Sequence, residues 1–401
     1  MYDWIIVGAG MAGLYAAYCL RLRHPEDSLL VLEGSSTPGG RASNTSFYGS
    51  TVVTGAGIGR WKKDRRLRRL MRDLHISPHS WTFQPQSSFQ SVDTGRIVRR
   101  LQRLQRHHRS CRLTFRQLGE RVLGKEGYRR FVKATGYSDF HRQDACDTLH
   151  RYGLDDTIGG WKGFSVPWKE LAERMIDRIG RRRIRFHQRV LEVKDLGDRV
   201  RLEVKDMTDS HSQEYTARRV LVATEVCTLR TLFPEHEVYR HIHPQSFLRL
   251  YARVAAGVSR ALMQQAVPGY RIVDGPLQKI IPIDGKKGLY MLSYSDNRHA
   301  DTVYKHAHDR EWLAATTERA LDLPKGSIQV TGVKALYFPV GTHYNAPLPD
   351  SYPSRAAFHE EALHPTPRIS VIGEAVSRHQ GWVEGALETV DEVLKGEKRR
   401  S

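Results

Sequence analysis

The sequence predicts an α/β protein in which a domain with a parallel β-sheet is interleaved along the chain with an α+β domain. Two observations support this prediction. Residues 4–33 read as an apolar strand, a glycine-rich turn, a helix and a second apolar strand, and residues 369–388 repeat the order of strand, glycine and helix. The chain has 401 residues, which is more than one ordinary domain requires, so two structural units are expected.

Residues 8–13 carry the glycine pattern of a dinucleotide-binding turn between the first strand and the first helix. Gly8 permits the tight turn, Gly10 lets the backbone approach a pyrophosphate, and Gly13 lets the helix pack close to the strand. The first amides of the helix and its dipole then favour phosphate groups. Glu33 ends the second strand about 20 residues after the last glycine, where a carboxylate accepts hydrogen bonds from ribose hydroxyls. Together these features predict a Rossmann-type domain.

A second set of glycines decides between NAD and FAD. Residues 39–41 (Gly-Gly-Arg) follow the second strand closely, a pattern that flavoproteins commonly carry. Near the other terminus, an apolar strand runs into a glycine–glutamate pair at 373–374 and then into a glycine-containing helix start. Two sites for phosphate and ribitol groups at opposite ends of the chain suit an extended FAD better than NAD. The sequence holds no second glycine motif for a nicotinamide, so the substrate is expected to reduce the flavin directly.

These segments resemble the flavin-containing amine oxidoreductase family, which includes monoamine oxidases and polyamine oxidases. The matching segments are residues 8–13, Glu33, 39–41, 53–59, the strand around Val190 and the block 373–388. The compact length is also similar to that of amine-oxidase-like proteins from some large DNA viruses and bacteria. Together with the glycine turn, the resemblance implies that FAD is bound by Gly8, Gly10, Met11, Ala12, Gly13, Glu33, Gly40, Arg41, Gly57, Ile58, Val190, Gly373, Glu374, Gly381, Trp382 and Val383.

The resemblance also implies a reaction and two aromatic residues. Family enzymes take a hydride from the carbon that bears an amine nitrogen, deliver it to flavin N5 and release an imine, and O2 then reoxidises the flavin and forms H2O2. Two aromatic rings flank the amine in the family. Trp382 matches one of these positions and Tyr344 is the candidate for the other, while a role in core packing stays open for both.

Two positions depart from the monoamine oxidase pattern. Arg249 stands where that pattern has a lysine near N5, with Lys279 as a second candidate and a surface position on an edge strand as the alternative for Arg249. An arginine stays charged, which favours anion or water binding over proton transfer. His343 occupies the place of the cysteine that tethers the flavin in monoamine oxidases. Non-covalent FAD is therefore expected, with a histidyl tether as the alternative.

The charge balance is strongly basic, with 63 Lys and Arg against 44 Asp and Glu and a formal net charge of +19. The basic residues concentrate in residues 60–72 and 99–109, and apolar residues at helical spacing from Ile97 onward predict an amphipathic helix in the second stretch. One interpretation is contact with a polyanion such as nucleic acid, and the alternative is two solvated helices. The positive electrostatic potential of such a protein disfavours a polycationic substrate unless the substrate pocket is acidic.

The cysteines indicate free thiols in a reducing compartment, and neither the cysteines nor the histidines indicate a metal site. The four cysteines have no CxxC or metal-type spacing, and His241 and His243 lack a third ligand at useful spacing. No apolar stretch approaches the roughly 18 residues of a membrane span. The first strand begins within a few residues of Met1, which leaves no space for a signal peptide. We expect a soluble, cytoplasmic protein whose partners are a small amine and O2.

The sequence predicts a division of the chain and a leading function. Residues 1–74, 184–235 and 365–401 are expected to form the FAD-binding domain, and residues 75–183 and 236–364 the substrate-binding domain. The leading expectation is an FAD-dependent amine oxidase. One alternative is a flavin-dependent desaturase or an oxidase of another non-amine substrate. The other is a basic flavin-fold protein that binds a partner with little turnover.

Overall fold

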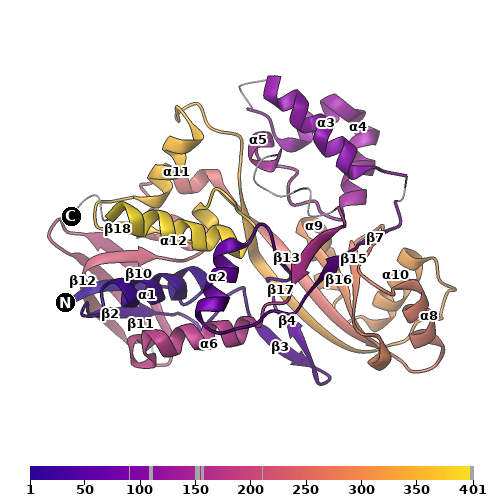
Figure 1. Ribbon diagram of the computed structural model, residues 1–401, viewed down its shortest axis with the longest axis horizontal. Helices are drawn as coiled ribbons and strands as arrows, with labels where there is room; N and C mark the ends of the chain where they lie inside the picture. Colours follow the sequence, from indigo (N-terminus) through magenta and orange to yellow (C-terminus); the bar gives the residue numbers. More distant parts are fainter. Residues whose placement is uncertain (90, 108–111, 150–153, 155–157, 210, 398–401) are drawn as a thin grey trace.

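The computed structural model describes residues 1–89, 91–107, 112–149, 154, 158–209 and 211–397. The protein is elongated, and two sheets follow one another along its long axis (Figure 1). The N-terminus lies at the end that holds the first sheet, and a helical lobe projects above the second sheet. Each sheet has its own apolar core, so the two units that the sequence predicts are distinct in the structure.

The first sheet contains the predicted Rossmann-type strands. Its parallel strands lie in the order β9 (Ile184–Arg185), β2 (Leu29–Leu32), β1 (Tyr2–Val7), β12 (Ser212–Val222) and β18 (Ile369–Val371). The long β12 also pairs antiparallel with β11 (Val200–Asp206), which pairs with β10 (Gln188–Asp195). Strand β2 is buried over its whole length, which explains its run of apolar residues. The prediction of an α/β fold is confirmed.

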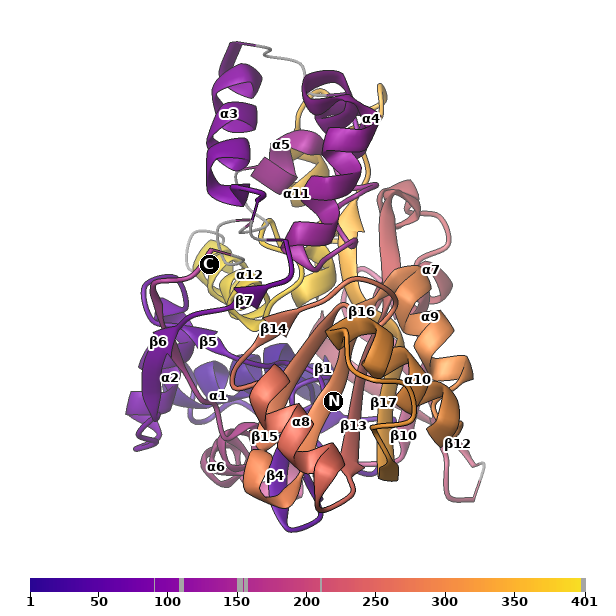
Figure 2. The same ribbon diagram turned by 90° about the vertical axis from the view of Figure 1, so that its right-hand side faces the viewer.

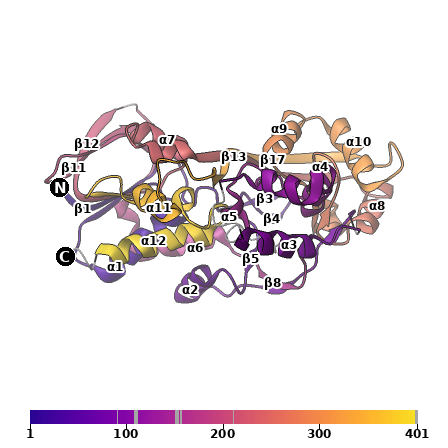
Figure 3. The same ribbon diagram turned by 90° about the horizontal axis from the view of Figure 1, so that it is seen from above.

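Helices cover the first sheet. Helix α1 (Met11–Arg23) packs against α6 (Trp168–Ile179) and α12 (Val383–Glu397), and α2 (Arg65–Asp73) packs against α12. Figure 3 shows α12 lying along α1 at the end of the molecule that holds the N-terminus. The start of α1 lies close to the sheet because Gly13 has no side chain, and a Cβ at this position would overlap the carbonyl oxygen of Gly8.

The second sheet is mixed and lies beyond the first. Its strands follow the order β17 (Val330–Asn345), β13 (Ile242–Val254), β16 (Leu289–Asp296), β15 (Lys279–Asp284), β14 (Arg271–Ile272) and β7 (Gln86–Ser87). All neighbouring pairs are antiparallel except β14 and β7. Helices α9 (Asn297–Lys305), α10 (Arg310–Leu321) and α8 (Val258–Ala266) lie around this sheet (Figure 2). The predicted α+β unit is therefore present.

A helical lobe stands beside the second sheet. Helices α3 (Thr94–His107), α4 (Phe115–Thr135) and α5 (Ala145–Asp147) share an apolar core that contains Phe115 and Phe131. Helix α4 starts with a capping box in which Thr114 and Gln117 exchange hydrogen bonds. The predicted amphipathic helix is α3, and residues 108–111 of that basic stretch lie outside the described residues.

Short elements complete the fold. They are the hairpin β3 (Asn44–Phe47) and β4 (Ser50–Val53), the three-stranded group β5 (Gly59–Arg60), β8 (Trp161–Phe164) and β6 (Ser80–Phe83), and the helices α7 (Val226–Leu232) and α11 (Arg355–Leu363). Within the described ranges, no helix combines the length and the apolar character that crossing a membrane requires.

Helix α6 belongs to the core of the first sheet. Its side chains Trp168, Leu171 and Met175 are buried there, next to α1. The expected boundaries place this helix with residues 75–183 in the substrate-binding domain. The exact division of the chain into domains stays a prediction.

Replacing Gly13 with alanine is expected to destabilise the ligand-free protein, because the new methyl group forces α1 away from Gly8. The loss should be roughly 1–3 kcal/mol and lower the thermal midpoint by a few degrees. Gly10→Ala is the matched control, since a Cβ on Gly10 meets no atom within 4 Å and its φ of −72° suits any residue. Identical melting curves for the two variants would contradict this prediction.

Candidate functional site

A large cavity lies between the two sheets. Its volume is about 2360 Å³, and its wall runs from the turn after β1 at Gly8 to Ile272 of β14. Pockets for a single small molecule usually have roughly 300–1000 Å³. The cavity therefore has space for an extended cofactor together with a substrate.

The cavity wall brings together segments from both ends of the chain. It contains all the residues expected to bind FAD except Gly13, namely Gly8, Gly10, Met11, Ala12, Glu33, Gly40, Arg41, Gly57, Ile58, Val190, Gly373, Glu374, Gly381, Trp382 and Val383. Gly13 lies behind the turn, where it packs against Gly8.

Glu33 lies at the end of β2, beside the glycine turn. Its Oε2 accepts a hydrogen bond from the Ala9 N–H at 2.6 Å, and its Oε1 accepts one from the Ser35 N–H at 2.8 Å. These bonds fix the carboxylate at the cavity wall and leave lone pairs for further donors. A ribose hydroxyl is the kind of donor that such a carboxylate binds.

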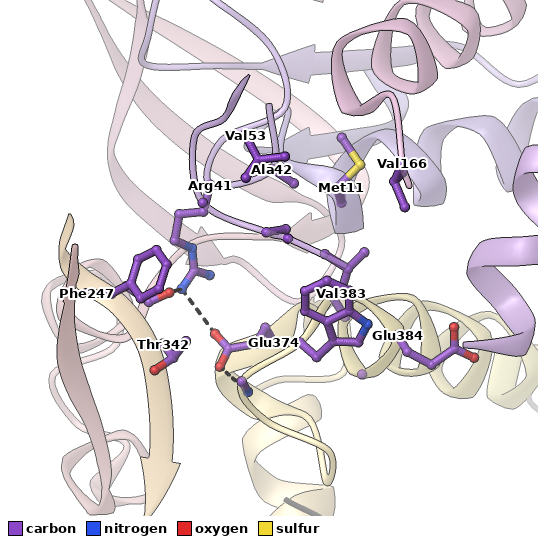
Figure 4. A pocket seen from close by; sticks show the side chains of 18 of the residues that line it. Met11, Arg41, Ala42, Val53, Val166, Phe247, Thr342, Glu374, Val383 and Glu384 are labelled. Carbon is purple, nitrogen blue, oxygen red and sulfur yellow. Dashed lines mark hydrogen bonds and ion pairs between the residues drawn. The ribbon is translucent and has the colours of Figure 1, made fainter. Parts of the chain in front are cut away.

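The carboxylate of Glu374 joins three distant segments. Its Oε1 accepts hydrogen bonds from the backbone N–H groups of His343 at 2.9 Å and Gly381 at 2.7 Å. Its Oε2 pairs with the Arg41 guanidinium at 3.1 Å and with Nδ1 of His343 at 2.6 Å. Figure 4 shows the Arg41–Glu374 pair at the cavity wall. The four contacts hold the segment after β2, strand β17 and the turn before α12 around one group.

Charge and hydrogen bonds keep Glu374 ionised. Burial alone would raise the pKa of this carboxyl, but His343, Arg41 and the Gly381 N–H lower its pKa to about 2. The Nε2 of His343 accepts a hydrogen bond from the Val226 N–H at 3.2 Å. Nδ1 of His343 therefore faces the Glu374 carboxylate, and Nε2 faces the Val226 N–H. Both ring nitrogens of His343 are thus engaged within the protein.

The ring of Trp382 is held at the cavity wall by its neighbours. Its Nε1–H donates a hydrogen bond to Oδ2 of Asp64 at 2.9 Å, and Asp64 is fully buried. The ring packs edge-on against Trp168, with 6.1 Å between centroids, and Arg60 lies over it at 5.1 Å. These contacts fix the orientation of a side chain that faces the cavity.

The two predicted cations of the second sheet occupy different places. Arg249 of β13 is buried and lines the cavity. Lys279 is fully buried behind the wall, where its Nζ donates to the Gly136 carbonyl oxygen and lies 3.3 Å from the Tyr137 ring centroid. Burial lowers the pKa of Lys279 to about 7, although the charge of Asp296 opposes this shift.

Tyr344 is not part of the cavity wall. Its ring stacks on His243, the residue opposite to it on β13, with 5.2 Å between centroids. Phe247 and Thr342 do line the cavity, and they lie across from Val383 in Figure 4.

The sequence does not reveal two residues of the site, Asp64 and Glu384. Asp64 lies within a basic stretch and Glu384 within the segment expected to bind the cofactor, and neither carries a signal of its own. The Glu384 carboxylate accepts the N–H groups of Arg66 at 2.8 Å and Leu67 at 3.0 Å, so it caps α2. In the part of the chain that the structure describes, no group of three or more His, Cys, Asp or Glu residues could hold a metal ion.

A Rossmann-type sheet whose nucleotide turn opens into a cavity shared with a second sheet defines a dinucleotide-dependent class of protein. Residues 6–74 match the NAD(P)-binding Rossmann-like domain, and residues 95–301 match the flavin containing amine oxidoreductase family. Because the second match covers more than half of the chain, this protein belongs to the flavin containing amine oxidoreductase family.

Solved structures support the same fold. The protein is similar to a triple mutant of putrescine oxidase made to redesign cofactor binding, with a TM-score of 0.75 and 15% identity over 100% of this chain and 99% of that chain. It is also similar to cyclohexylamine oxidase from Brevibacterium oxydans IH-35A, with a TM-score of 0.74 and 15% identity over 98% of this chain and 99% of that chain. At this identity the likeness shows the fold alone. No curated protein sequence matches the chain.

Glu374→Gln is expected to lower the free energy of unfolding and to make it less dependent on acid pH. The pKa of Glu374 is about 2 in the folded protein against an ordinary 4.5, so the unfolded chain binds more protons between these values. Folded wild type therefore loses stability as the pH falls through this window, and the variant lacks that part of the loss.

Urea unfolding at pH 7, 5 and 3 measures the effect. At pH 7 the variant should be less stable by about 3 kcal/mol, because a neutral amide loses the stabilisation that the folded protein gives to the ionised carboxylate. Glu192→Gln, at an exposed position of β10, is the control. An unchanged acid loss in Glu374→Gln would refute this assignment.

Proposed function

We propose that the protein is an FAD-dependent oxidase of amines, which forms an imine from a CH–NH group and H2O2 from O2. The observation that carries this proposal is the continuity of the cavity. Its wall passes from Gly8 in the nucleotide turn, along Trp382, to Arg249 and Tyr294 of the second sheet. One long cofactor in this cavity would have its nucleotide end at the first sheet and its reactive ring beside the second.

The residues at the nucleotide end suit a dinucleotide. The first N–H groups of α1 have no acceptor within the helix, and the helix dipole adds positive charge there. Gly10 and Gly40 leave this wall without side chains, and the φ of +57° at Gly40 favours glycine at that position. Glu33 presents its carboxylate at the end of β2, where ribose hydroxyls would bind.

The residues at the other end suit the flavin ring. Helix α12 begins directly after Gly381 and Trp382, and both line the cavity. The positive end of the α12 dipole would favour electron density on a ring held at this place. Arg41, fixed by Glu374, lines the same cavity from the segment that follows β2.

The protein's part in the reaction is to bind and orient the amine. When bound, FAD supplies the acceptor for the hydride that leaves the carbon next to nitrogen. Trp382, fixed by Asp64, forms one wall for the amine, and Phe247 forms another across the cavity. The apolar walls exclude water while the amine loses a hydride and a proton. O2 accepts the two electrons and two protons and leaves as H2O2.

The cofactor is proposed to be non-covalent. His343 is the residue at the tether position, and both its ring nitrogens are engaged with Glu374 and Val226. It does not line the cavity. We expect acid precipitation of the holoprotein to leave the yellow flavin in the supernatant. Flavin that stays with the precipitate would refute non-covalent binding.

Anaerobic mixing with a panel of amines tests the proposed reaction. We expect the visible flavin absorbance to bleach with an amine and to return, with H2O2 released, when O2 is admitted. Trp382→Ala should lower kcat/KM by roughly 10- to 100-fold, because the amine loses its orienting wall. Trp382→Phe should keep part of the activity.

Trp312→Phe is the control, since Trp312 stacks on His306 outside the cavity wall. Bleaching by an alkane-type substrate and by no amine would overturn the proposal in favour of a desaturase.

A further inference from the structure

Arg249 is a buried cation at the cavity wall. Its exposed fraction is 3%, and within the described residues it forms no ion pair with an aspartate or glutamate. The guanidinium Nε donates to the Gly55 carbonyl oxygen at 2.6 Å, and Nη1 contacts the Met291 sulfur at 3.2 Å. A buried charge without an opposite charge is costly. This position therefore favours an anion that comes from outside the chain.

The surroundings of Arg249 form a site for such an anion. The guanidinium carbon lies 4.2 Å from the Tyr294 ring centroid and 5.1 Å from that of Phe247. Gly57 leaves space beside Nη2, and a Cβ there would come within 2.8 Å of it. Nε makes the bond to Gly55 and Nη1 the contact with Met291, so N–H groups of Nη1 and Nη2 remain for a ligand. Their planar fork matches the two oxygens of a carboxylate.

The carboxylates at this end of the cavity do not neutralise Arg249. Asp296 accepts hydrogen bonds from the Ser138 N–H at 3.0 Å and from the Ser138 hydroxyl. Asp296 and Asp139 act on the charge of Lys279, which lies 4.1 Å from the Tyr294 centroid. Neither forms an ion pair with Arg249 among the residues described.

Charge elsewhere in the protein favours the same kind of ligand. Arg99 of α3 is exposed and also lines the cavity. The formal net charge of +19 attracts anionic groups and repels polycations over long range. A substrate with a negative group is thus favoured before it reaches Arg249.

We propose that Arg249 binds the carboxylate of the substrate, so that the preferred substrates are amines that carry a carboxylate. This inference rests on the proposed amine oxidation. The adjoining wall contains Phe247, Tyr270, Ile272 and Tyr294, which suit an apolar or aromatic substituent. Negative charge on the reduced flavin is the other source of an anion at this position, and the experiment below separates the two.

The test compares phenylalanine with 2-phenylethylamine, which differ only in the carboxylate. Wild type should reduce its flavin faster with phenylalanine under anaerobic conditions. Arg249→Met should lower kcat/KM for phenylalanine by roughly 10- to 100-fold and change that for 2-phenylethylamine by less than about threefold. Arg249→Lys should lie between, since it keeps the charge and loses the fork.

Arg253→Met is the matched control. Arg253 lies on the same strand and over a tyrosine ring, 4.8 Å from the Tyr48 centroid, but it does not line the cavity. Arg253→Met should leave kcat/KM unchanged for both substrates. Benzoate titrated into the oxidised holoprotein gives a second readout, and Arg249→Met should weaken the benzoate-induced change in the flavin spectrum by the same factor. Arg249→Lys serves both measurements if the methionine variant does not fold.

The outcomes separate the inference from the proposed function. Equal loss for both substrates in Arg249→Met would place the anion on the flavin and overturn the inference. Reduction by 2-phenylethylamine alone would overturn it and leave amine oxidation standing. If neither compound reduces the flavin, amine oxidation is in doubt, and the benzoate titration decides the anion site: weakening by Arg249→Met supports it, and unchanged binding overturns it.

Discussion

The buried carboxylate of Glu374 is the interaction on which the geometry of the site depends. One side chain accepts hydrogen bonds from Arg41, from the backbone and ring of His343 and from the backbone of Gly381. Arg41 lies in the segment after β2, His343 in the second sheet, and Gly381 in the turn before the last helix. Both oxygens are saturated, so the carboxylate has no competing arrangement to adopt. This one group therefore links two segments of the cavity wall, those of Arg41 and Gly381, to strand β17.

The first sheet and its nucleotide turn could be predicted because their signals are local. Strand, glycines and helix follow one another within residues 4–33. Position 13 has to be glycine because a side chain there would clash with the nearby carbonyl oxygen of Gly8. The same holds for the pair at 373–374, since a glycine and an acid directly after a buried strand lie at the edge of the sheet where ligands bind. Family membership followed from these motifs, and the match over residues 95–301 confirmed it.

The partners of these residues could not be predicted, because they join side chains that are far apart in the sequence. Asp64 lies among arginines that suggested only a charged surface, yet it is buried and orients Trp382. Tyr344 was expected at the cavity, but it lies two residues beyond Thr342, about 7 Å along the strand, and meets His243 instead. The burial of Arg249 likewise depends on Gly55 and Met291. Contact of the basic surface with a polyanion stays a prediction.

The position of Arg41 and Glu374 in the chain has a consequence for biosynthesis. These partners are 333 residues apart. On a ribosome, β1, α1 and β2 emerge early, whereas β12 and α12, which complete their surroundings, are made much later. Until then the nascent chain exposes unpaired strand edges and an unfinished groove, the state in which chaperones protect large proteins. The wall of the cavity between the sheets is therefore complete only after residues 373–388 have been made.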